Sequence, residues 1–367
     1  MQKDINKEHL LKFVNNYDKK SNSFLPSLSP ISPILVLGDC GIDKYTSGEV
    51  SRISPEAPVA ILEVVREWFK LGLAANINDN LKELGLNSTL LSVIGTDNTG
   101  DKFLSLLAER GLGQQGIVFD PNRKTTLKER VITKTQQICR IDHETKEKVS
   151  TDITANLILK IETLLSSHSG LIIEDYGKGL ITEELSQRAI KIFTSANKIV
   201  TIDPSRSTPP HFFRGATLIK PNYDEAKILV AKLGYSPETI GTKKTRNIII
   251  KEMAEILAGK LNISKIVITL GAEGMALLDT DSINKENFAI IPTVAKEVFD
   301  VSGAGDTVIS VLTIALLHGA NLQQAAWIAN CAAGVVVGKR GTATVSAEEL
   351  SSAIQKEIHC LRISSPP

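Results

Sequence analysis

Cysteines are few and far apart in this 367-residue sequence, at Cys40, Cys139, Cys331 and Cys360. No two of them form a C-x-x-C pair, so the spacing favours reduced, mostly buried thiols over a disulfide framework or a zinc site. The first 20 residues contain scattered acidic residues and no apolar segment, which argues against a secretory signal. The longest apolar run, residues 308–317, is too short to cross a bilayer. We therefore expect a cytoplasmic protein with no membrane partner.

An excess of charge is also absent, because 42 Lys and Arg balance 41 Asp and Glu. The net charge of +1 argues against a general nucleic-acid-binding surface, so any basic site must be local. No G-x-x-x-x-G-K-[ST] run occurs, which excludes a P-loop. The segment GLGQQG, residues 111–116, matches G-x-G-x-x-G, but a helical pattern precedes it and a strand pattern follows. Because this order is the reverse of a dinucleotide-binding turn, we interpret the segment as a helix end and a turn.

The chain divides into three parts. Residues 1–33 form a charged stretch that ends in a Ser/Pro linker, residues 34–355 form the main domain, and residues 356–367 form a tail. Within the main domain, helical patterns at 72–84, 100–110, 181–195 and 247–260 lie between apolar strand patterns. These strand patterns cover residues 34–38, 89–95, 170–177, 198–204, 216–222 and 265–271. The alternation predicts an α/β fold with a mainly parallel sheet covered on both faces.

Two segments interrupt this alternation. Residues 43–65 and 117–142 carry short alternating patterns of apolar and polar residues, which predict antiparallel strands outside the main sheet. A small β flap, or lid, over the active end of the sheet fits this placement.

A glycine turn opens a long apolar helical pattern near the C-terminus. The turn is Gly303-Ala304-Gly305, and Asp306 follows it at once. A helix N-terminus offers unpaired N–H groups and a partial positive charge, and glycines let an anion touch those groups. Asp306 then suits a general base that takes a proton from a hydroxyl attacking a phosphorus atom. A tight turn with Asp306 as a helix cap explains this stretch equally well.

The remaining motifs favour the first interpretation. GAGD opening a helix is the C-terminal signature of the ribokinase-like (PfkB) carbohydrate kinases, and the chain resembles that family from about residue 34 to residue 350. Within the family, the chain resembles the heptose 7-phosphate kinases of lipopolysaccharide core synthesis. The motifs that carry this resemblance are LVLGDCGIDKYTSGEVSRISPEAPVAILEV, TQQICRID, EDYGKG, IDPSR…FRGATLIKPNYDEA, EVFDVSGAGDTVI and NCAAGVVVGKRGTATVS.

The resemblance implies a three-layer α/β/α sandwich with a lid, and a reaction. ATP and D-glycero-β-D-manno-heptose 7-phosphate give the 1,7-bisphosphate and ADP, with Mg²⁺ as the metal cofactor. Some such kinases carry a fused nucleotidyltransferase domain. Because no H-x-G-H-type element occurs here, we expect a separate nucleotidyltransferase to act in the same pathway.

On the nucleotide side, the resemblance assigns Asp306 as the base and residues 303–305 as the anion hole. It assigns Asn222 and Glu225 to Mg²⁺ and phosphate positioning, although both also fit a capping box. Asp300 would organise a monovalent cation such as K⁺, and a structural turn aspartate is an equal alternative. The remaining nucleotide-side residues, each of which a plain turn or helix packing also explains, are Thr269, Gly271, Gly274 and Asn330.

On the sugar side, Asp39 and Asp43 would accept hydrogen bonds from sugar hydroxyls, and Gly72 and Asn76 would lie beside the sugar. The 7-phosphate needs cations, for which Arg suits bidentate contacts and Lys supplies a point charge. The basic residues inside the shared motifs are Arg52, Arg140 and Lys178.

One residue departs from the heptose kinase pattern. The heptose kinases read Gly-Gly-Ala-Ala-Asn here, and Leu73 occupies the position of the second glycine. Because leucine is bulkier than glycine, the identity of the accepted sugar stays open. Two alternatives follow, namely a kinase for another phosphosugar and a catalytically weak sugar or nucleotide sensor. An outlying flap leaves strand edges to be covered, and related kinases pair this way, so we also expect a homodimer.

Overall fold

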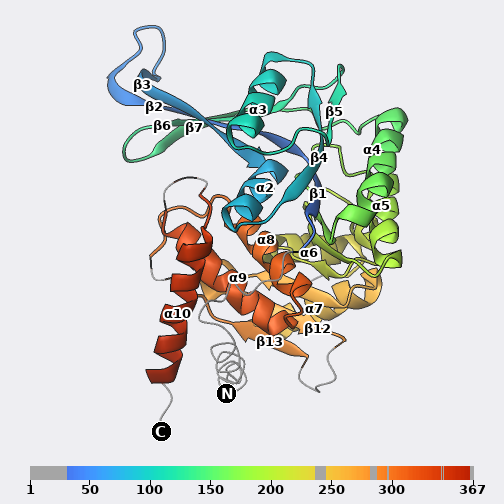
Figure 1. Ribbon diagram of the computed structural model, residues 1–367. Helices are drawn as coiled ribbons and strands as arrows, with labels where there is room; N and C mark the ends of the chain where they lie inside the picture. The colour runs from blue at the N-terminus through green and yellow to red at the C-terminus, as the bar shows by residue number, and fades with distance from the viewer. Residues whose placement is uncertain are drawn as a thin grey trace.

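The computed structural model describes residues 31–235, 245–281, 287–295, 297–339, 341 and 343–363 (Figure 1). The predicted N-terminal extension lies outside the described residues except for residues 31–33. The predicted start of the tail, residue 356, falls inside the last helix, α10 (Ala347–Ile363). In the described part of the chain, no helix is long and apolar enough to cross a membrane.

A nine-stranded sheet forms the centre of the described structure. Six neighbouring pairings are parallel, and only the pairings of β11, β12 and β13 are antiparallel. The spatial order is β13 (Phe288–Ile291), β12 (Met275–Asp279), β11 (Lys265–Thr269), β10 (Leu218–Ile219), β9 (Ile199–Asp203), β8 (Gly170–Glu174), β1 (Ile34–Gly38), β4 (Ser88–Gly95) and β5 (Ile117–Asp120).

Helices cover both faces of this sheet, and each face has its own core. Along β1, Ile34 and Val36 pack into one core while Leu35 and Leu37 pack into the other. This explains why the strand is a continuous apolar run, as expected of a parallel strand buried on both faces. The first core includes α2 (Ala74–Glu83), α3 (Asn98–Glu109), α8 (Ala304–Leu317), α9 (Leu322–Val337) and α10. The second includes α4 (Thr151–Leu164), α5 (Glu183–Ser195), α6 (Tyr223–Lys232) and α7 (Arg246–Leu261).

Three short 3₁₀ helices complete the described elements, η1 (Leu165–Ser167), η2 (Pro210–Phe213) and η3 (Gly271–Glu273). The predicted three-layer α/β/α fold with a mainly parallel sheet is thus confirmed.

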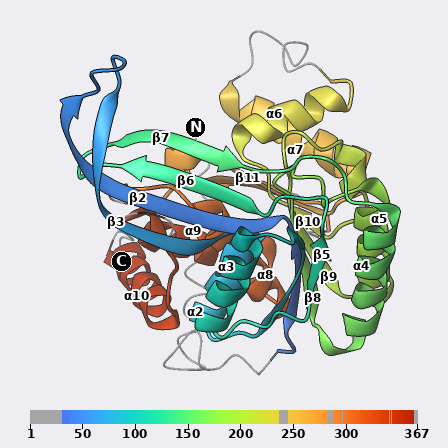
Figure 2. The ribbon, with the colours of Figure 1, turned by 90° about the horizontal axis from the view of Figure 1, so that it is seen from above.

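A second sheet projects from the molecule as a lid (Figures 1 and 2). Its spatial order is β3 (Ala60–Leu73), β2 (Cys40–Ile53), β6 (Thr126–Ile132) and β7 (Gln137–His143). The pairs β2–β3 and β6–β7 are antiparallel, and a parallel pairing of β2 with β6 joins them. β2 begins one residue after β1, and β3 runs directly into α2. The lid is therefore continuous with the centre of the main sheet.

The structure differs from the sequence-based expectation at two places near the lid. The first strand of the predicted lid segment 117–142 is β5, which pairs in parallel with β4 in the main sheet. The helix predicted from residue 72 begins at Ala74, because β3 continues to Leu73. Apolar alternation alone does not tell which sheet a short strand joins, so the first difference reflects packing with distant residues.

Candidate active site

A cleft of about 1010 Å³ lies at the C-terminal ends of the central parallel strands. Open α/β sheets bind ligands at this edge. Its walls come from the ends of β8, β9 and β11, the segment that leads into α6, and the first turn of α8. The lining residues are Lys146, Glu174, Asp175, Tyr176, Gly177, Lys178, Asp203, Pro204, Ser205, Arg206, Ser207, Lys220, Asn222, Tyr223, Asp224, Glu225, Arg246, Thr269, Leu270, Gly271, Val301, Gly303, Gly305 and Asp306.

The N-terminus of α8 faces this cleft through its glycine turn. Gly303 is left-handed, with φ of 80°, and α8 begins at Ala304. A Cβ atom added to Gly305 would lie 3.6 Å from Nζ of Lys220 and 3.7 Å from Oδ2 of Asp203. The first N–H groups of a helix have no partner within the helix. The open turn therefore combines helix N–H groups with a lysine ammonium, which is the chemistry that holds a phosphoryl group.

Asp306 is buried in the first turn of α8 and is held on both sides. Asn76 Nδ2 donates to its Oδ2 at 2.6 Å, and the Tyr176 hydroxyl donates to its Oδ1 at 2.8 Å. Burial raises the pKa of Asp306 to about 6, although the two hydrogen bonds oppose that rise. A carboxyl group with such a pKa is mostly ionised at pH 7 and can still accept a proton readily, as a general base requires.

α2 fixes this arrangement through asparagines one helical turn apart. Asn80 lies four residues after Asn76, and its Nδ2 donates to the Asn76 carbonyl. The Thr307 hydroxyl donates to Oδ1 of Asn80 at 2.9 Å. Residues four apart share a helix face, so both asparagines meet α8. Asn76 contacts the candidate base, and its predicted contact with the sugar stays a prediction.

Leu73 lies directly before α2 in a backbone conformation that favours glycine. Its φ is 58° and its ψ is −140°. Its side chain is only 6% exposed, and Leu73 is not among the residues that line the cleft. The leucine therefore strains the backbone at the junction of β3 and α2.

Three charged residues form a buried row beneath the start of α8. Glu174 ends β8, Asp203 ends β9, and Lys220 follows β10. These three strands are neighbours in the sheet, so the three residues lie side by side at its C-terminal edge. Lys220 Nζ lies 2.6 Å from Oδ2 of Asp203. Burial alone would lower the pKa of Lys220, but the charge and hydrogen bond of Asp203 outweigh it and hold that pKa above its usual value.

Glu174 is the unusual member of this row. It is fully enclosed, and within the described residues its Oε2 has no hydrogen-bond partner. Burial, followed by the charges of Asp203 and Asp306, raises the pKa of Glu174 well above its usual value. The raised pKa favours the protonated form of this acid, and the protonated form adds no negative charge beside the open turn of α8.

Asp39 lies beside the cleft but supports a loop. Its carboxylate accepts hydrogen bonds from the backbone N–H groups of Tyr176, Lys178 and Leu180. Asp39 is 4% exposed and does not line the cleft. The carboxylate thus supports the EDYGKG loop, and its contact with a sugar hydroxyl stays a prediction.

Asn222 and Glu225 form a complete capping box at the start of α6. Asn222 Oδ1 accepts from the Glu225 N–H at 2.9 Å, and Glu225 Oε2 accepts from the Asn222 N–H at 2.9 Å. Both residues line the cleft. Burial, followed by the charge of Asp203, raises the pKa of Glu225. The box thus leaves Glu225 facing the cleft, where one carboxylate suffices for a hydrated Mg²⁺.

The other predicted nucleotide-side residues separate into two groups. Thr269 and Gly271 line the cleft, and Thr269 pairs with Asn222 through an isolated bridge. Gly274 does not line it, and a Cβ there would lie 1.9 Å from the Ile291 carbonyl, so this glycine permits the approach of β13. Asn330 is buried and donates to the Pro292 carbonyl, which holds the segment after β13.

Asp300 fastens the loop before the glycine turn. Its Oδ1 accepts from the Ser302 N–H at 2.9 Å, and its Oδ2 accepts from the Gly341 N–H at 3.1 Å. These bonds match the turn-aspartate alternative. Among the described residues, no group of three or more His, Cys, Asp and Glu side chains is placed to hold a metal ion. A monovalent cation beside Asp300 stays a prediction.

The lid presents charged side chains toward the cleft. Lys128 Nζ lies 5.2 Å from the ring centroid of Tyr176, which fixes the face of the lid that turns inward. Register partners and alternate residues share that face. We define the inner lid face by the charged residues that this register places there, which are Asp43, Arg66, Lys70, Lys128, Arg130, Arg140 and Asp142.

Asp43 is the buried carboxylate of the inner lid face. Arg130 Nη1 lies 2.7 Å from its Oδ1, so the two form an ion pair that is mostly shielded from solvent. A Cβ added to Gly72 would lie 3.1 Å from Cγ of Asp43. Gly72 therefore leaves room for the aspartate, and Ala at this position would push against it.

The predicted phosphate-binding cations lie in different surroundings. Lys178 is 14% exposed and pairs with Glu144, and Arg140 is 51% exposed and pairs with Asp142. Arg52 lies near the lid tip, is 64% exposed and pairs with Glu63. Arg52 does not line the cleft, and its role in phosphate binding stays a prediction.

Sequence reasoning missed three residues of the site, Lys220, Tyr176 and Lys128. Each lies near a strand end or beside a predicted residue, and their proximity to Asp306 depends on chain segments more than 80 residues away. A charged residue directly after a buried strand was the available signal for Lys220.

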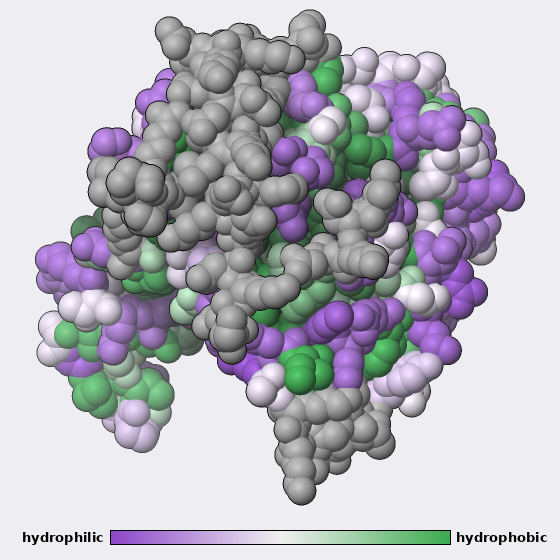
Figure 3. Space-filling model, turned by 90° about the horizontal axis from the view of Figure 1, so that it is seen from below, coloured by the Kyte–Doolittle hydropathy of each residue, from purple (hydrophilic) through white to green (hydrophobic). Residues whose placement is uncertain are grey.

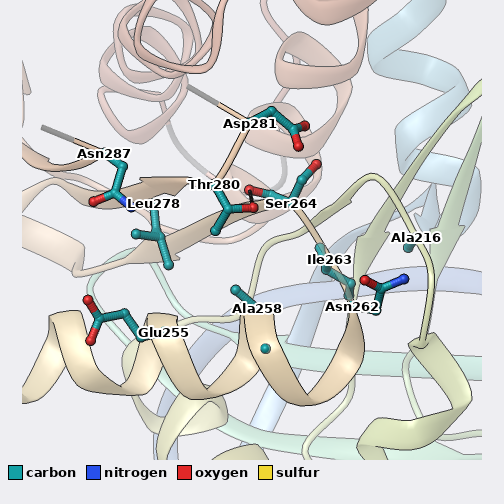
Figure 4. Close-up of a pocket in the computed structure, with 11 residues that line it drawn as sticks. Ala216, Glu255, Ala258, Asn262, Ile263, Ser264, Leu278, Thr280, Asp281 and Asn287 are labelled. Atoms are coloured by element: carbon teal, nitrogen blue, oxygen red, sulfur yellow. Dashed lines mark hydrogen bonds between the residues drawn. The ribbon is translucent and has the colours of Figure 1, made fainter. Parts of the chain in front are cut away.

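A second cavity of about 570 Å³ lies at the opposite edge of the sheet (Figure 4). α7 contributes Glu255 and Ala258, the turn after it contributes Asn262, and the end of β12 contributes Thr280. None of its lining residues is among the described side chains that have a buried polar atom without a partner. The cleft at the C-terminal strand ends is therefore the better candidate for chemistry.

Comparison with known proteins agrees with this geometry. The model of the pfkB family carbohydrate kinases matches residues 49–350. The chain is 39% identical over 336 residues to the bifunctional protein HldE of Desulfatibacillum aliphaticivorans, covering 92% of this chain and 66% of that protein. It is 38% identical over 318 residues to the bifunctional protein HldE of Helicobacter pylori strain J99, covering 87% and 65%. The chain thus spans slightly less than two thirds of the length of these relatives.

Solved structures show the same fold at low identity. The phosphofructokinase-2 of Escherichia coli in complex with potassium superposes with a TM-score of 0.70 at 19% identity, covering 90% of this chain and all of that one. The ribokinase of Thermotoga maritima superposes with a TM-score of 0.65 at 19% identity, covering 89% and 100%. At this level of identity, the two similarities show a shared fold and nothing about substrate.

Proposed function

The chain belongs to the pfkB family of carbohydrate kinases, and from this premise we propose that it phosphorylates D-glycero-β-D-manno-heptose 7-phosphate. The phosphoryl group of ATP goes to the anomeric hydroxyl and gives the 1,7-bisphosphate and ADP. The observation that carries the proposal is the buried Asp306 carboxylate, which lies beside the open turn of α8 and close to Lys220. The choice of sugar rests on the resemblance of the motifs to the heptose 7-phosphate kinases, and the cations of the inner lid face support it.

The residues of the cleft fit ATP with Mg²⁺. Gly305 is open toward Lys220, so a phosphoryl oxygen can reach both the helix N–H groups and the ammonium. Glu225 would hold Mg²⁺ partly through water, and Mg²⁺ would neutralise charge on the phosphates. Burial raises the pKa of Glu174, and this favours the protonated form, which does not repel these anions.

Asp306 acts on the acceptor hydroxyl. The hydroxyl proton passes to the Asp306 carboxylate, and the sugar oxygen forms a bond to the γ-phosphorus. The bond from that phosphorus to the bridging oxygen breaks, and its electron pair leaves with ADP. The N–H groups at residues 303–305 and Lys220 stabilise the phosphoryl oxygens in transit. Positioned acid–base groups contribute about 10²–10⁴-fold to such a step.

The inner lid face supplies the contacts that a phosphosugar needs. Lys128, Arg130 and Arg140 share this face, and Lys178 lies in the neighbouring loop. A guanidinium binds a phosphate in two parallel hydrogen bonds, and an ammonium adds a point charge. Asp43, paired with Arg130, is placed to accept a hydrogen bond from a sugar hydroxyl. We assign the 7-phosphate to these cations, in place of Arg52.

We also propose that two copies of the chain pair through their lids. Green, hydrophobic atoms lie on the lobe at the left edge of Figure 3, which corresponds to the lid. Exposed apolar side chains gather on these strands and at their tip, namely Val50, Ile53, Val59, Val64, Val65, Ile138 and Ile141. Isolated sheet edges with such side chains need cover. A monomer at micromolar concentration by light scattering would contradict the pairing.

The relatives are described as bifunctional, and the chain matches about two thirds of their length. We propose that the product is passed to a nucleotidyltransferase activity that these 367 residues do not contain. This assignment rests on the names of the relatives and on the resemblance of the motifs.

An ADP-release assay tests the proposal. Purified protein would be given ATP and Mg²⁺ with heptose 7-phosphate, fructose 6-phosphate, ribose or adenosine as acceptor. We expect selective turnover of heptose 7-phosphate, and loss of turnover with retained ligand binding in Asp306→Asn. Selective turnover of fructose 6-phosphate would move the substrate, and full activity of Asp306→Asn would remove the assigned base.

A further inference from the structure

Tyr176 connects the lid to the candidate base. Its ring lies under the Lys128 ammonium of β6, with 5.2 Å between Nζ and the ring centroid. Its hydroxyl donates to Oδ1 of Asp306 at 2.8 Å. The face of the ring makes the first contact, its hydroxyl makes the second, and Tyr176 lines the cleft.

The chemistry of the tyrosine fixes the direction of its hydrogen bond. Burial of its hydroxyl, followed by the charges of Asp306 and Glu174, raises the pKa of Tyr176 well above its usual value. The hydroxyl therefore stays protonated and donates to the carboxylate. A donor to a carboxylate favours the ionised form, so this contact keeps more of Asp306 in the state that accepts a proton.

We propose that Tyr176 is a positioning residue through which the lid cation Lys128 orients and ionises Asp306. The kinetic test of this proposal rests on the proposed function, whereas the titration of Asp306 does not. Cation–π contact holds the ring over the cleft, and the ring directs the hydroxyl at the carboxylate. An anionic group bound at Lys128 would then act on the position of the base.

The other charged groups around Asp306 are constant in the comparison that tests this role. Glu174 and Asp203 lie at the ends of β8 and β9, and Lys220 follows β10. Asn76 of α2 holds the second carboxylate oxygen. Tyr176→Phe removes one hydroxyl and leaves all these groups and the ring itself in place.

The test titrates the Asp306 carboxyl by carbon-detected NMR of protein labelled at aspartate. The signal is assigned by its absence from Asp306→Asn, which is necessary because burial also raises the pKa of Asp175 to about 6. We expect Tyr176→Phe to move the midpoint upward by about one pH unit, as loss of a hydrogen bond to a charged group predicts.

A matched control is available in the same chain. Lys260 Nζ lies 5.3 Å from the ring centroid of Tyr235, and Tyr235 does not line the cleft. Tyr235→Phe should leave the midpoint unchanged. An unchanged midpoint in Tyr176→Phe as well would overturn the proposal.

Lys128→Met tests the lid half of the connection. It should raise the Asp306 midpoint, and the double variant with Tyr176→Phe should show no more than the Tyr176→Phe shift. Additive shifts would mean that Lys128 acts on Asp306 directly through its charge, and this would overturn the role of the ring.

Kinetics separate positioning from a structural role. With the midpoint one unit higher, Tyr176→Phe should lose about fivefold in kcat/KM at pH 6 and regain nearly wild-type kcat/KM at pH 8. An equal loss at both pH values would contradict the proposal. Absence of turnover by the wild-type protein would count against the proposed substrate, and the NMR result would still decide the role of Tyr176.

Discussion

Replacing Asp306 by Asn should remove activity. It should also make the unfolding free energy of the variant, relative to wild type, greater at neutral pH than at acidic pH. The pKa of Asp306 is about 6 in the folded protein, against 3.8 for an ordinary aspartate, and burial is the largest cause. The folded state therefore binds the proton more tightly than the unfolded state does. Stability from this group is complete below pH 3.8 and is lost as the pH rises through 6.

The magnitude follows from the difference between the two pKa values. A difference of about two units corresponds to about 3 kcal/mol of unfolding free energy when the group is ionised in the folded state. Between pH 5 and pH 7.5, this group alone lowers the unfolding free energy of the wild-type protein by about 1.4 kcal/mol. The asparagine does not titrate, so its variant lacks this loss.

Urea unfolding of both proteins at pH 5 and pH 7.5 measures the effect. In the variant, the NH₂ group of the new asparagine faces the donor of either Asn76 or Tyr176, and that hydrogen bond is lost. The loss costs about 1–3 kcal/mol of unfolding free energy at either pH. That cost cancels when the two pH values are compared. We expect the stability of Asp306→Asn relative to wild type to increase by about 1.4 kcal/mol from pH 5 to pH 7.5. A constant difference would refute the raised pKa and, with it, the argument for Asp306 as base.

Two further predictions use pairs of matched residues. Arg130→Met should raise KM for heptose 7-phosphate at least tenfold, because a charged hydrogen bond contributes about 1.5–3 kcal/mol. Arg52→Met at the lid tip should leave this KM unchanged. Equal effects of the two variants in steady-state kinetics would contradict our placement of the phosphate. Leu73→Gly should cost about 1–3 kcal/mol less unfolding free energy than Leu71→Gly, because both leucines are buried in β3 and only Leu73 has a positive φ. Equal costs in urea unfolding would show that the backbone at Leu73 is not strained.

The layers of the fold were predictable because they depend on local patterns. Each buried parallel strand is a short apolar run, and helical patterns separate these runs, so residue order alone predicts a covered parallel sheet. The GAGD turn was found for the same reason, since its glycines and the carboxylate are adjacent in sequence. The partition of residues 117–142 between two sheets was not local, and the prediction was wrong there for β5.

The partners of the site residues were less predictable. Asn76 and Asp306 are 230 positions apart, and their hydrogen bond depends on how α2 crosses α8. Arg52 shares a motif with Asp43, yet it lies nine residues further along β2, which at about 3.3 Å per residue separates them by about 30 Å. Sequence proximity thus suggested one site for residues that an extended strand keeps apart.

The continuity of the lid with the main sheet determines where the lid can bend. Asp39 is the one residue between β1 and β2, and its carboxylate is bound to three backbone N–H groups of the EDYGKG loop. No residue separates β3 from α2, which carries Asn76. This hairpin therefore has no flexible hinge at its base, and its motion must come from bending within the strands, at the register shifts after Ser47 and Val50. Any displacement that reaches the base of the hairpin is passed to α2, and through Asn76 to the carboxylate of Asp306, the proposed base.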